Sequence, residues 1–502
     1  MELPIPEFSP AFAARLRTAF DRNGYDVSGV RDALGVTAQA ALVRGEPEPA
    51  TRACADKGEL GTLIRLFLLA EAQSERAVGA AISPATVDDA VAAGMLVRTD
   101  GGQVRAALDI RPHGEDDHSW WVVSDLGAEH LGADVPSDHV VGVGQASLSL
   151  VRATRRRPVD SLLDLGTGNG VQVLHGHQHA RQVTATDVTP RALAIARTTF
   201  RLNELDVTLL QGEWFAPVAR RRFDQIVCNP PFVVGPGDTD YIYRDSGLSG
   251  DDASALVVRQ LPGFLTEGGV GQSLASWLHI RGQDWDDRVS GWLPGGAEAW
   301  FVQRDVADPA WYVGTWLRDA GIDPASDLGR AKTRQWLEFF RARDVEGIGF
   351  GFVTLRRTDA TPTVVCEDLR HSFDDPLGPE SARWLDAVAW LREHGSDLLG
   401  QRYVVAESVR QERLESLTEN GWGTTQRVLH RTTGAGWRHE LDEHVSMLLA
   451  GCHGTLPMSD LVGLLAAARD VPADGIAAEL VPLLRQLVLH GMLEPAEWQH
   501  AS

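Results

Sequence analysis

The sequence predicts an α/β fold built on a mostly parallel sheet. Three observations carry this prediction, and all of them lie between residues 161 and 232. Short apolar runs of buried-strand character recur at residues 161–165, 182–186, 207–210 and 223–228. The first run leads into a glycine-rich turn and a helix, and the fourth ends in the string Asn229-Pro230-Pro231-Phe232. Strands that alternate with helices in this way are typical of a parallel sheet.

The glycines after the first strand suit the close approach of a ligand. Gly166, Gly168 and Gly170 follow Asp164, and glycine lets the backbone turn tightly with no Cβ in the way. The residues after Gly170 are expected to begin a helix whose N-terminus faces the ligand. The second strand ends at Asp187, 23 residues after Asp164. In a Rossmann-like site an acidic residue at this position accepts hydrogen bonds from ribose hydroxyls.

The third strand leads to an acidic and aromatic pair, Glu213 and Trp214. The carboxylate suits an adenine amino group, and the aromatic ring suits stacking on the base. A nicotinamide dinucleotide site is the alternative, but it requires the pattern Gly-x-Gly-x-x-Gly. Here the third glycine, Gly170, comes one residue too early for that pattern. The turn therefore favours a different nucleoside.

The fourth strand delivers a motif suited to a planar nitrogen. A neutral amide or aromatic amine is a poor nucleophile because its lone pair is delocalised. The side-chain oxygen of Asn229 and the carbonyl of Pro230 can each accept one N–H of the target, which orients the lone pair and disperses developing positive charge. The two prolines stiffen the loop, and Phe232 offers a face for stacking. We expect Asn229, Pro230 and Phe232 to be the catalytic residues.

At these residues the chain resembles the class I S-adenosylmethionine-dependent methyltransferases that carry an Asn-Pro-Pro-Phe/Tyr motif. The resemblance covers about residues 140–357. It implies a Rossmann-like core with a seven-stranded, mostly parallel sheet, and S-adenosylmethionine as cofactor. The cofactor-binding residues that it implies are Asp164, Gly166, Thr167, Gly168, Gly170, Asp187, Glu213, Trp214 and Asn229.

Two branches of that class are similar to different parts of the chain. The strings Gln211-Gly212-Glu213-Trp214-Phe215 and Asn229-Pro230-Pro231-Phe232 look like the release-factor glutamine methyltransferases. The lead-in Gly142-Val143-Gly144-Gln145-Ala146-Ser147-Leu148 is more similar to the ribosomal-RNA guanine-N2 methyltransferases of the small-domain type. The leading hypothesis is a base nitrogen in structured ribosomal or transfer RNA. A glutamine amide in a translation release factor and a small-molecule nitrogen are the alternatives.

Charge and composition limit the possible partners. The chain has 502 residues, 43% of them hydrophobic, and a formal net charge of −22. A protein that captures nucleic acid through bulk electrostatics is expected to be basic, so any RNA contact must use a local patch. No apolar run of eighteen residues predicts a membrane span. Four scattered cysteines fit a reducing compartment, and we expect a cytoplasmic protein.

The sequence predicts four parts along the chain. These are a mainly helical, winged-helix-like domain over residues 1–135, the methyltransferase domain over 136–357 with an insertion near 281–346, a linker and accessory region over 358–435, and a winged-helix-like domain over 436–502. In both flanking domains a helix is followed by Gly-Met-Leu, at Gly94 and at Gly491, as where a winged helix enters its wing. With this acidic balance, protein docking or substrate positioning is favoured over nucleic-acid binding for these units.

Two further features of the sequence bear on the site. The insertion is rich in aromatic residues, which are expected to be mostly core but can also form the wall of a substrate pocket. His175, His177 and His179 have a spacing that a metal site allows. Methyl transfer needs no metal, and no cysteine lies nearby, so we expect no metal site there.

Overall fold

The computed structural model describes residues 5–115, 118–127, 130, 135–237, 246–371, 377–419 and 421–500. The chain divides into two compact units, each described here by itself. The first comprises Met1–Val151 and Arg157–Asp368, and the second comprises Arg152–Arg156 and Leu369–Ser502. The domain boundaries drawn from the sequence remain predictions.

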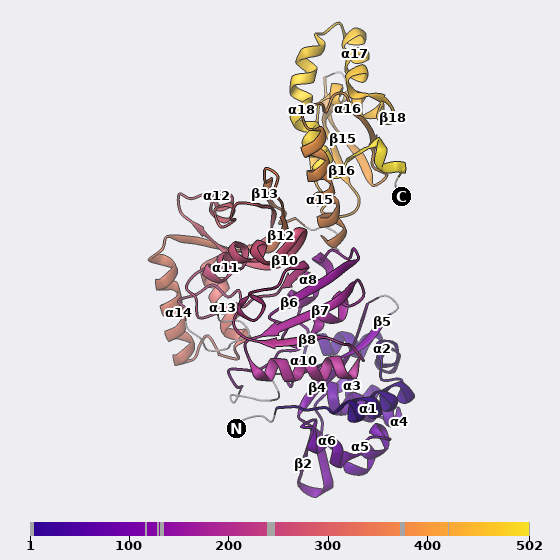
Figure 1. Cartoon of the computed structure of the whole chain (residues 1–502), viewed down its shortest axis with the longest axis vertical. Coiled ribbons are helices and arrows are strands. Elements are labelled where there is room, and N and C mark those ends of the chain that lie inside the picture. Colours follow the sequence, from indigo (N-terminus) through magenta and orange to yellow (C-terminus); the bar gives the residue numbers. More distant parts are fainter. Residues whose placement is uncertain are drawn as a thin grey trace. The chain divides into compact units, whose positions relative to one another are not determined.

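The core of the first unit is an eight-stranded sheet in the order β13-β11-β12-β10-β9-β6-β7-β8 (Figure 1). Its strands are β6 (Val159–Leu165), β7 (Ala180–Asp187), β8 (Thr208–Gln211), β9 (Phe223–Cys228), β10 (Leu265–Ile280), β11 (Ala297–Ala307), β12 (Val345–Arg357) and β13 (Val364–Asp368). Only the two pairings made by β12 are antiparallel. The predicted mostly parallel α/β core is thus confirmed, with one strand more than the expected seven.

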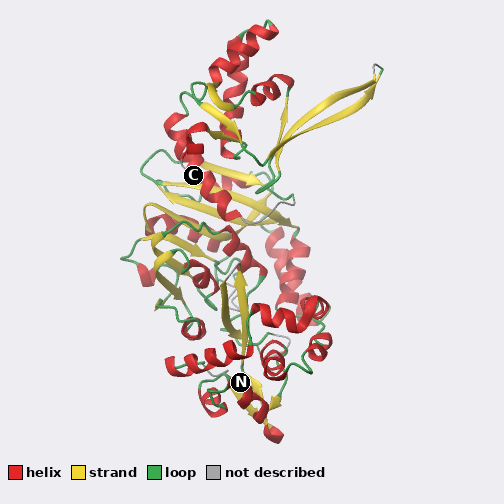
Figure 2. Cartoon of the chain, turned by 90° about the vertical axis from the view of Figure 1, so that its right-hand side faces the viewer, coloured by secondary structure: helices red, strands yellow, loops and turns green. Residues whose placement is uncertain are grey.

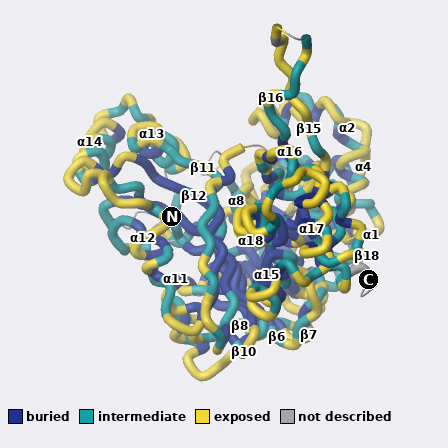
Figure 3. Tube along the Cα trace, turned by 90° about the horizontal axis from the view of Figure 1, so that it is seen from above, coloured by how far each residue is buried: buried dark blue, intermediate teal, exposed yellow. Residues whose placement is uncertain are grey.

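Helices cover both faces of this sheet. Adjacent residues of β6 point to opposite faces, as strand geometry requires: Leu162 packs with α9 (Val171–Gly176) and α10 (Pro190–Leu202), whereas Leu163 packs with α11 (Asp252–Gln260) and α12 (Trp285–Ser290). The inner strands are therefore largely buried, and Figure 3 shows buried residues gathered in the sheet, whereas the edge strands β8 and β13 are more exposed. A further helix, α8 (Gln145–Ala153), precedes β6.

Two expectations about the later part of the core were wrong. The predicted insertion at residues 281–346 contains β11, an inner strand of the sheet whose residues 297–303 are all buried. The segment added between β11 and β12 is shorter and holds α13 (Pro309–Asp319) and α14 (Asp327–Arg341). The predicted linker also contains β13, which pairs with β11 at the end of the sheet. Residues 372–376 of that linker lie outside the described part.

The N-terminal region has the connectivity of a winged helix. Its three-stranded sheet has the order β1-β3-β2, in which a short first strand pairs with the hairpin of the wing. Its elements are α1 (Pro10–Asn23), α2 (Val27–Val43), α3 (Glu48–Ala53), α4 (Gly58–Leu63), β1 (Gln73–Ser74), α5 (Glu75–Ile82), α6 (Val87–Ala92), β2 (Leu96–Thr99) and β3 (Gln103–Ala106). A second hairpin, β4 (Leu108–Glu115) and β5 (His118–Asp125), leads toward the core.

The second unit also has a three-stranded sheet with helices, but its middle strand comes from earlier in the chain. The order is β18-β14-β19, and β14 precedes the region predicted as winged helix. The elements are α15 (Leu377–His394), β14 (Arg402–Val405), β15 (Val409–Thr418), β16 (Gly421–Arg431), β17 (Arg438–Leu441), α16 (Glu443–Ala450), β18 (His453–Pro457), α17 (Met458–Arg469), α18 (Ala473–Leu489) and β19 (Leu493–Pro495). Strands β15 and β16 form the long two-stranded ribbon visible in Figure 2.

Candidate functional site

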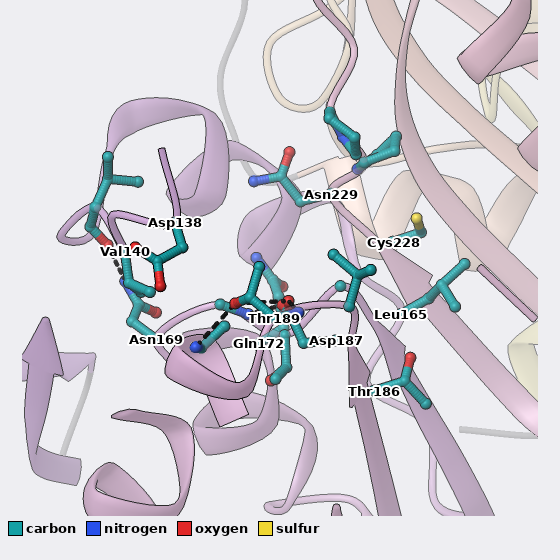
Figure 4. A pocket seen from close by; sticks show the side chains of 18 of the residues that line it. Asp138, Val140, Leu165, Asn169, Gln172, Thr186, Asp187, Thr189, Cys228 and Asn229 are labelled. Carbon is teal, nitrogen blue, oxygen red and sulfur yellow. Dashed lines mark hydrogen bonds between the residues drawn. The ribbon is translucent and has the colours of Figure 1, made fainter. Parts of the chain in front are cut away.

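A cavity of about 650 Å³ lies at the carboxyl ends of β6, β7 and β9 (Figure 4). Strand β6 lies between β7 and β9, so the chain leaves it in one direction and later returns on its other side. In open α/β sheets, ligands bind in the crevice at such a switch in strand order. The position of the cavity therefore follows from the topology.

The glycine turn that follows β6 lines part of this cavity. Gly166, Gly168 and Gly170 have φ values of 78°, 53° and 89°, a region that favours glycine. Gly166 and Gly168 line the cavity, and a Cβ on either would meet no protein atom within 4 Å. Gly170 does not line it, because it lies against α10: a Cβ there would come within 2.5 Å of Phe200. The third glycine thus serves helix packing rather than the direct ligand contact that we expected.

Asp187 ends β7 beside the turn. One carboxylate oxygen accepts a hydrogen bond from the Gly168 amide at 3.0 Å, and the other accepts one from the Thr189 amide at 3.0 Å. Burial raises the pKa of this carboxyl group. Asp187 lines the cavity and holds the glycine turn and the start of α10 in place.

Asp164 lies beneath the turn and is fully buried. It does not line the cavity, and neither of its carboxylate oxygens has a hydrogen-bond partner of good geometry among the described residues, although the Thr167 hydroxyl lies close enough to lower its pKa. Burial raises its pKa to about 7. The hydroxyl of Thr167, which does line the cavity, is likewise buried with no partner in the described part of the chain. Buried polar atoms are nearly always satisfied in folded proteins, so the Thr167 hydroxyl indicates a place for a polar ligand group in the cavity.

Glu213 and Trp214 line another wall of the cavity. Trp214 has a φ of 46°, which is uncommon for a residue with a side chain. The preceding Gly212 donates its amide hydrogen to the carbonyl of Asp187 at 3.0 Å. The pair is therefore joined through Gly212 to the residue expected to hold a ribose.

Asn229 presents a free acceptor atom at the cavity. Its amide nitrogen donates to the Ser147 hydroxyl at 3.2 Å, which orients the side chain. Its amide oxygen is buried and has no hydrogen-bond partner among the described residues. Pro230 also lines the cavity. Phe232 does not: its ring centroid lies 5.4 Å from that of Phe350 and 6.3 Å from that of Trp316.

Several wall residues were missed by the sequence analysis, among them Asp138, His139, Val140, Gln172 and Thr189. Two sequence features could have indicated these residues: the segment that leads into α8, and the predicted start of α10. The Gln172 side chain donates to the carbonyl of Ser147 at 2.9 Å, and Thr189 caps α10 by accepting from Ala192 at 3.0 Å. A Thr-Pro string ahead of an apolar helix marks such a cap.

The helices added between β11 and β12 pack on the loop after Asn229. The Tyr312 hydroxyl accepts a hydrogen bond from the Val234 amide at 2.8 Å. Trp336 lies over Gly235, where a Cβ would come within 3.1 Å of its ring. Aromatic side chains of α13 and α14 therefore pack on the segment that follows the Asn-Pro-Pro-Phe motif.

The three histidines considered for a metal site are separated. His175 Nε2 lies 2.8 Å from His113 Nε2, and His179 Nε2 lies 2.8 Å from the Gln225 side-chain oxygen. Among the described residues, no three His, Cys, Asp or Glu side chains are grouped as a metal ion requires.

No helix among the residues that the structure describes is long and apolar enough to cross a membrane.

Comparisons with known proteins agree with this geometry. Residues 140–245 match the family model "methyltransferase small domain", and residues 22–107 and 382–495 match two domains of unknown function. The chain is 34% identical over 143 residues to a release factor glutamine methyltransferase of Geobacter sulfurreducens (26% of this chain, 48% of the relative). It is 31% identical over 144 residues to a ribosomal protein uL3 glutamine methyltransferase of Bradyrhizobium diazoefficiens (26% and 44%).

The matched region spans about half the length of these curated relatives. Among solved structures, the 16S rRNA N2 G1207 methyltransferase of T. Thermophilus, in complex with AdoMet and guanosine, is 17% identical. That match covers 45% of this chain and 60% of the other, with a TM-score of 0.27.

Proposed function

We propose that this chain, which carries a methyltransferase small domain at residues 140–245, transfers a methyl group from S-adenosylmethionine to a planar amine or amide nitrogen. The observation that carries the proposal is the buried, unpartnered amide oxygen of Asn229 at the edge of the cavity. A buried acceptor without a donor is costly, and an N–H group of the methyl acceptor would satisfy it.

The cavity residues fit the cofactor. Asp187 would accept from the ribose hydroxyls, and Glu213 and Trp214 would hold the adenine. The Thr167 hydroxyl in the cavity wall would bind a polar group of the molecule, and the Asp164 carboxyl group beneath the turn would favour its positively charged part when ionised. The open space at Gly166 and Gly168 leaves room for close approach. S-adenosylmethionine would supply the electrophilic methyl group.

The protein's own contribution is to orient the acceptor nitrogen. Ser147 holds the Asn229 amide nitrogen, so the amide oxygen stays available for an N–H of the acceptor. The Pro230 carbonyl would accept the second N–H. Both oxygens would stabilise positive charge as it develops on the nitrogen, and no side-chain base is needed because the product cation loses its proton readily.

A protein glutamine is the acceptor that we favour. The two curated relatives described above are named as glutamine methyltransferases. The helix before the wing, which reads DNA in winged-helix proteins, is acidic here: α6 carries Asp88 and Asp89 and no basic residue. The net charge of −22 also disfavours a polyanion.

An exocyclic base nitrogen in RNA, our leading hypothesis from the sequence, is the second candidate. The observation that favours it is Ser147, which belongs to the lead-in similar to the RNA enzymes and directly contacts Asn229. Mass spectrometry of release factors, ribosomal proteins and RNA from a deletion strain separates the two. The strain is complemented with the wild-type chain or with Asn229→Ala. Loss of a glutamine methyl group, restored only by the wild type, is expected. Loss from an RNA base instead supports the second candidate, and no lost methyl group in either contradicts both.

A further inference from the structure

A buried ion pair joins the N-terminal region to the helix beside the cavity. The carboxylate of Asp125, the last residue of β5, accepts two hydrogen bonds from the guanidinium of Arg191 in α10, one of them at 2.8 Å from Nε. The side chains are 0% and 3% exposed. A buried ion pair of this kind is costly to desolvate, so its presence is not explained by stability alone.

The same carboxylate also binds a second segment of the cavity wall. Asp125 Oδ2 accepts a hydrogen bond from the Val140 amide at 2.9 Å, and the Asp125 amide donates to the Val140 carbonyl at 3.0 Å. Val140 lines the cavity together with Asp138 and His139. Figure 4 shows Asp138 and Val140 on the same side of the cavity.

Arg191 lies between residues that line another part of the cavity wall. Thr189, Pro190 and Ala192, at the start of α10, line the cavity. Asp125 therefore connects two walls that are about 50 residues apart in sequence, and it lies outside the segment that matches the methyltransferase small domain. Fixed spacing between walls is what a preorganised binding site requires.

The rest of β5 holds α10 along its length. The Trp121 amide donates to the Asn203 side-chain oxygen at 3.0 Å, and the Val123 amide donates to the Thr199 hydroxyl at 3.1 Å. Backbone amides of β5 thus find hydrogen-bond acceptors in side chains of α10 and of its C-cap residue, Asn203. Asp125 is the residue of this contact that also binds Val140, which lines the cavity.

We infer that Asp125 is a positioning residue for cofactor binding, acting through Arg191 and Val140 to set the separation of the two walls. By this inference the N-terminal region is part of the cofactor site, although it does not line the cavity. The inference rests on the proposed function. Its test therefore measures cofactor binding without any methyl acceptor.

The test is calorimetric titration of the full chain with S-adenosylmethionine, with the unfolding midpoint measured on the same samples. Asp125→Asn keeps an acceptor for the Val140 amide but removes the charge opposite Arg191. Arg191→Gln removes the guanidinium. Each is expected to raise the Kd at least about tenfold, because small displacements of binding groups have effects of this size. The double variant is expected to be no weaker than the worse single variant, because both act through one contact.

Glu298→Gln is the matched control. Glu298 is fully buried and pairs with Arg356, and strand register places the pair beside Val270 and Gln225. Gln225 lies four residues before Asn229, toward the opposite end of the strands from the cavity. This control is expected to lower the unfolding midpoint and leave the Kd unchanged.

The outcomes are distinguishable. Asp125→Asn with a lowered midpoint and a wild-type Kd, like the control, would show that the pair is only structural. If Asp125→Asn does not fold, Arg191→Lys decides, since it keeps the charge and loses the two-point geometry: a wild-type Kd then contradicts the inference. A wild-type chain that does not bind S-adenosylmethionine overturns the proposed function, and this inference falls with it.

Discussion

The hydroxyl of Tyr312 accepts a hydrogen bond from the backbone amide of Val234 at 2.8 Å, in a buried position. Tyr312 belongs to α13, and Val234 lies five residues after Asn229. A helix outside the eight-stranded sheet thus holds the loop that follows Asn229, the residue that we propose binds the methyl acceptor. Under the proposed function, the added helices support the residues that bind the acceptor.

Tyr312→Phe is expected to reduce turnover while leaving the affinity for S-adenosylmethionine unchanged. The substitution leaves the buried Val234 amide without an acceptor, which costs about 1–3 kcal/mol, and the loop is expected to relax toward other conformations. Steady-state kinetics with saturating cofactor measure the effect. Trp311→Phe is the control, because its side chain is adjacent and exposed. Equal turnover for Tyr312→Phe and the control would contradict the prediction.

Asn229→Ala is expected to bind cofactor nearly as well as the wild type and to transfer methyl groups far more slowly. Losing one preorganised acceptor of this kind reduces the rate about 10²–10³-fold. Asn229→Asp keeps an acceptor oxygen and is expected to retain more activity than Ala. Single-turnover rates of methyl transfer to the unmethylated acceptor measure the difference. A near wild-type rate for Asn229→Ala would show that the motif is only a turn.

Asp164 gives a pH dependence with a definite sign. Burial disfavours the carboxylate and raises its pKa to about 7 in the folded chain, from the ordinary value of 3.8 expected in the unfolded chain. The folded chain therefore binds this proton more tightly, and the carboxyl group costs stability increasingly as the pH rises from about 4 to 7. Asp164→Asn has no such group to ionise. Its unfolding midpoint relative to the wild type is expected to be higher at pH 8 than at pH 5. A constant difference between the two pH values would contradict the assignment.

The sequence predicted the parts of the fold that depend on local pattern. The runs at residues 161–165 and 223–228 fall within β6 and β9, and the acidic residue at position 187 lies at the end of β7 as expected. Each of these follows from apolar runs and from the residues that a tight turn requires. Strand β11 was missed because its apolar run lies among aromatic residues that were assigned to an insertion, and β10 was not predicted separately.

Contacts between distant residues were beyond the sequence. The motif containing Gly170 did not show that this glycine packs on Phe200, and Phe232 was expected to face the acceptor but lies against Phe350. Ser147 was noted only as part of a lead-in, and nothing local indicates that it orients Asn229. The link between Asp125 and Arg191 spans 66 residues and depends on how β5 docks on α10.

The most direct test of the account is calorimetric titration of the wild-type chain and of Asp187→Ala, each with S-adenosylmethionine and with a nicotinamide dinucleotide. Asp187 is the residue expected to hold the ribose, and hydrogen bonds to a charged group contribute about 1–3 kcal/mol. The account predicts that the wild type binds S-adenosylmethionine, that Asp187→Ala binds it more weakly by this amount, and that neither binds the dinucleotide. Binding of the dinucleotide by a wild-type chain that does not bind S-adenosylmethionine would contradict it.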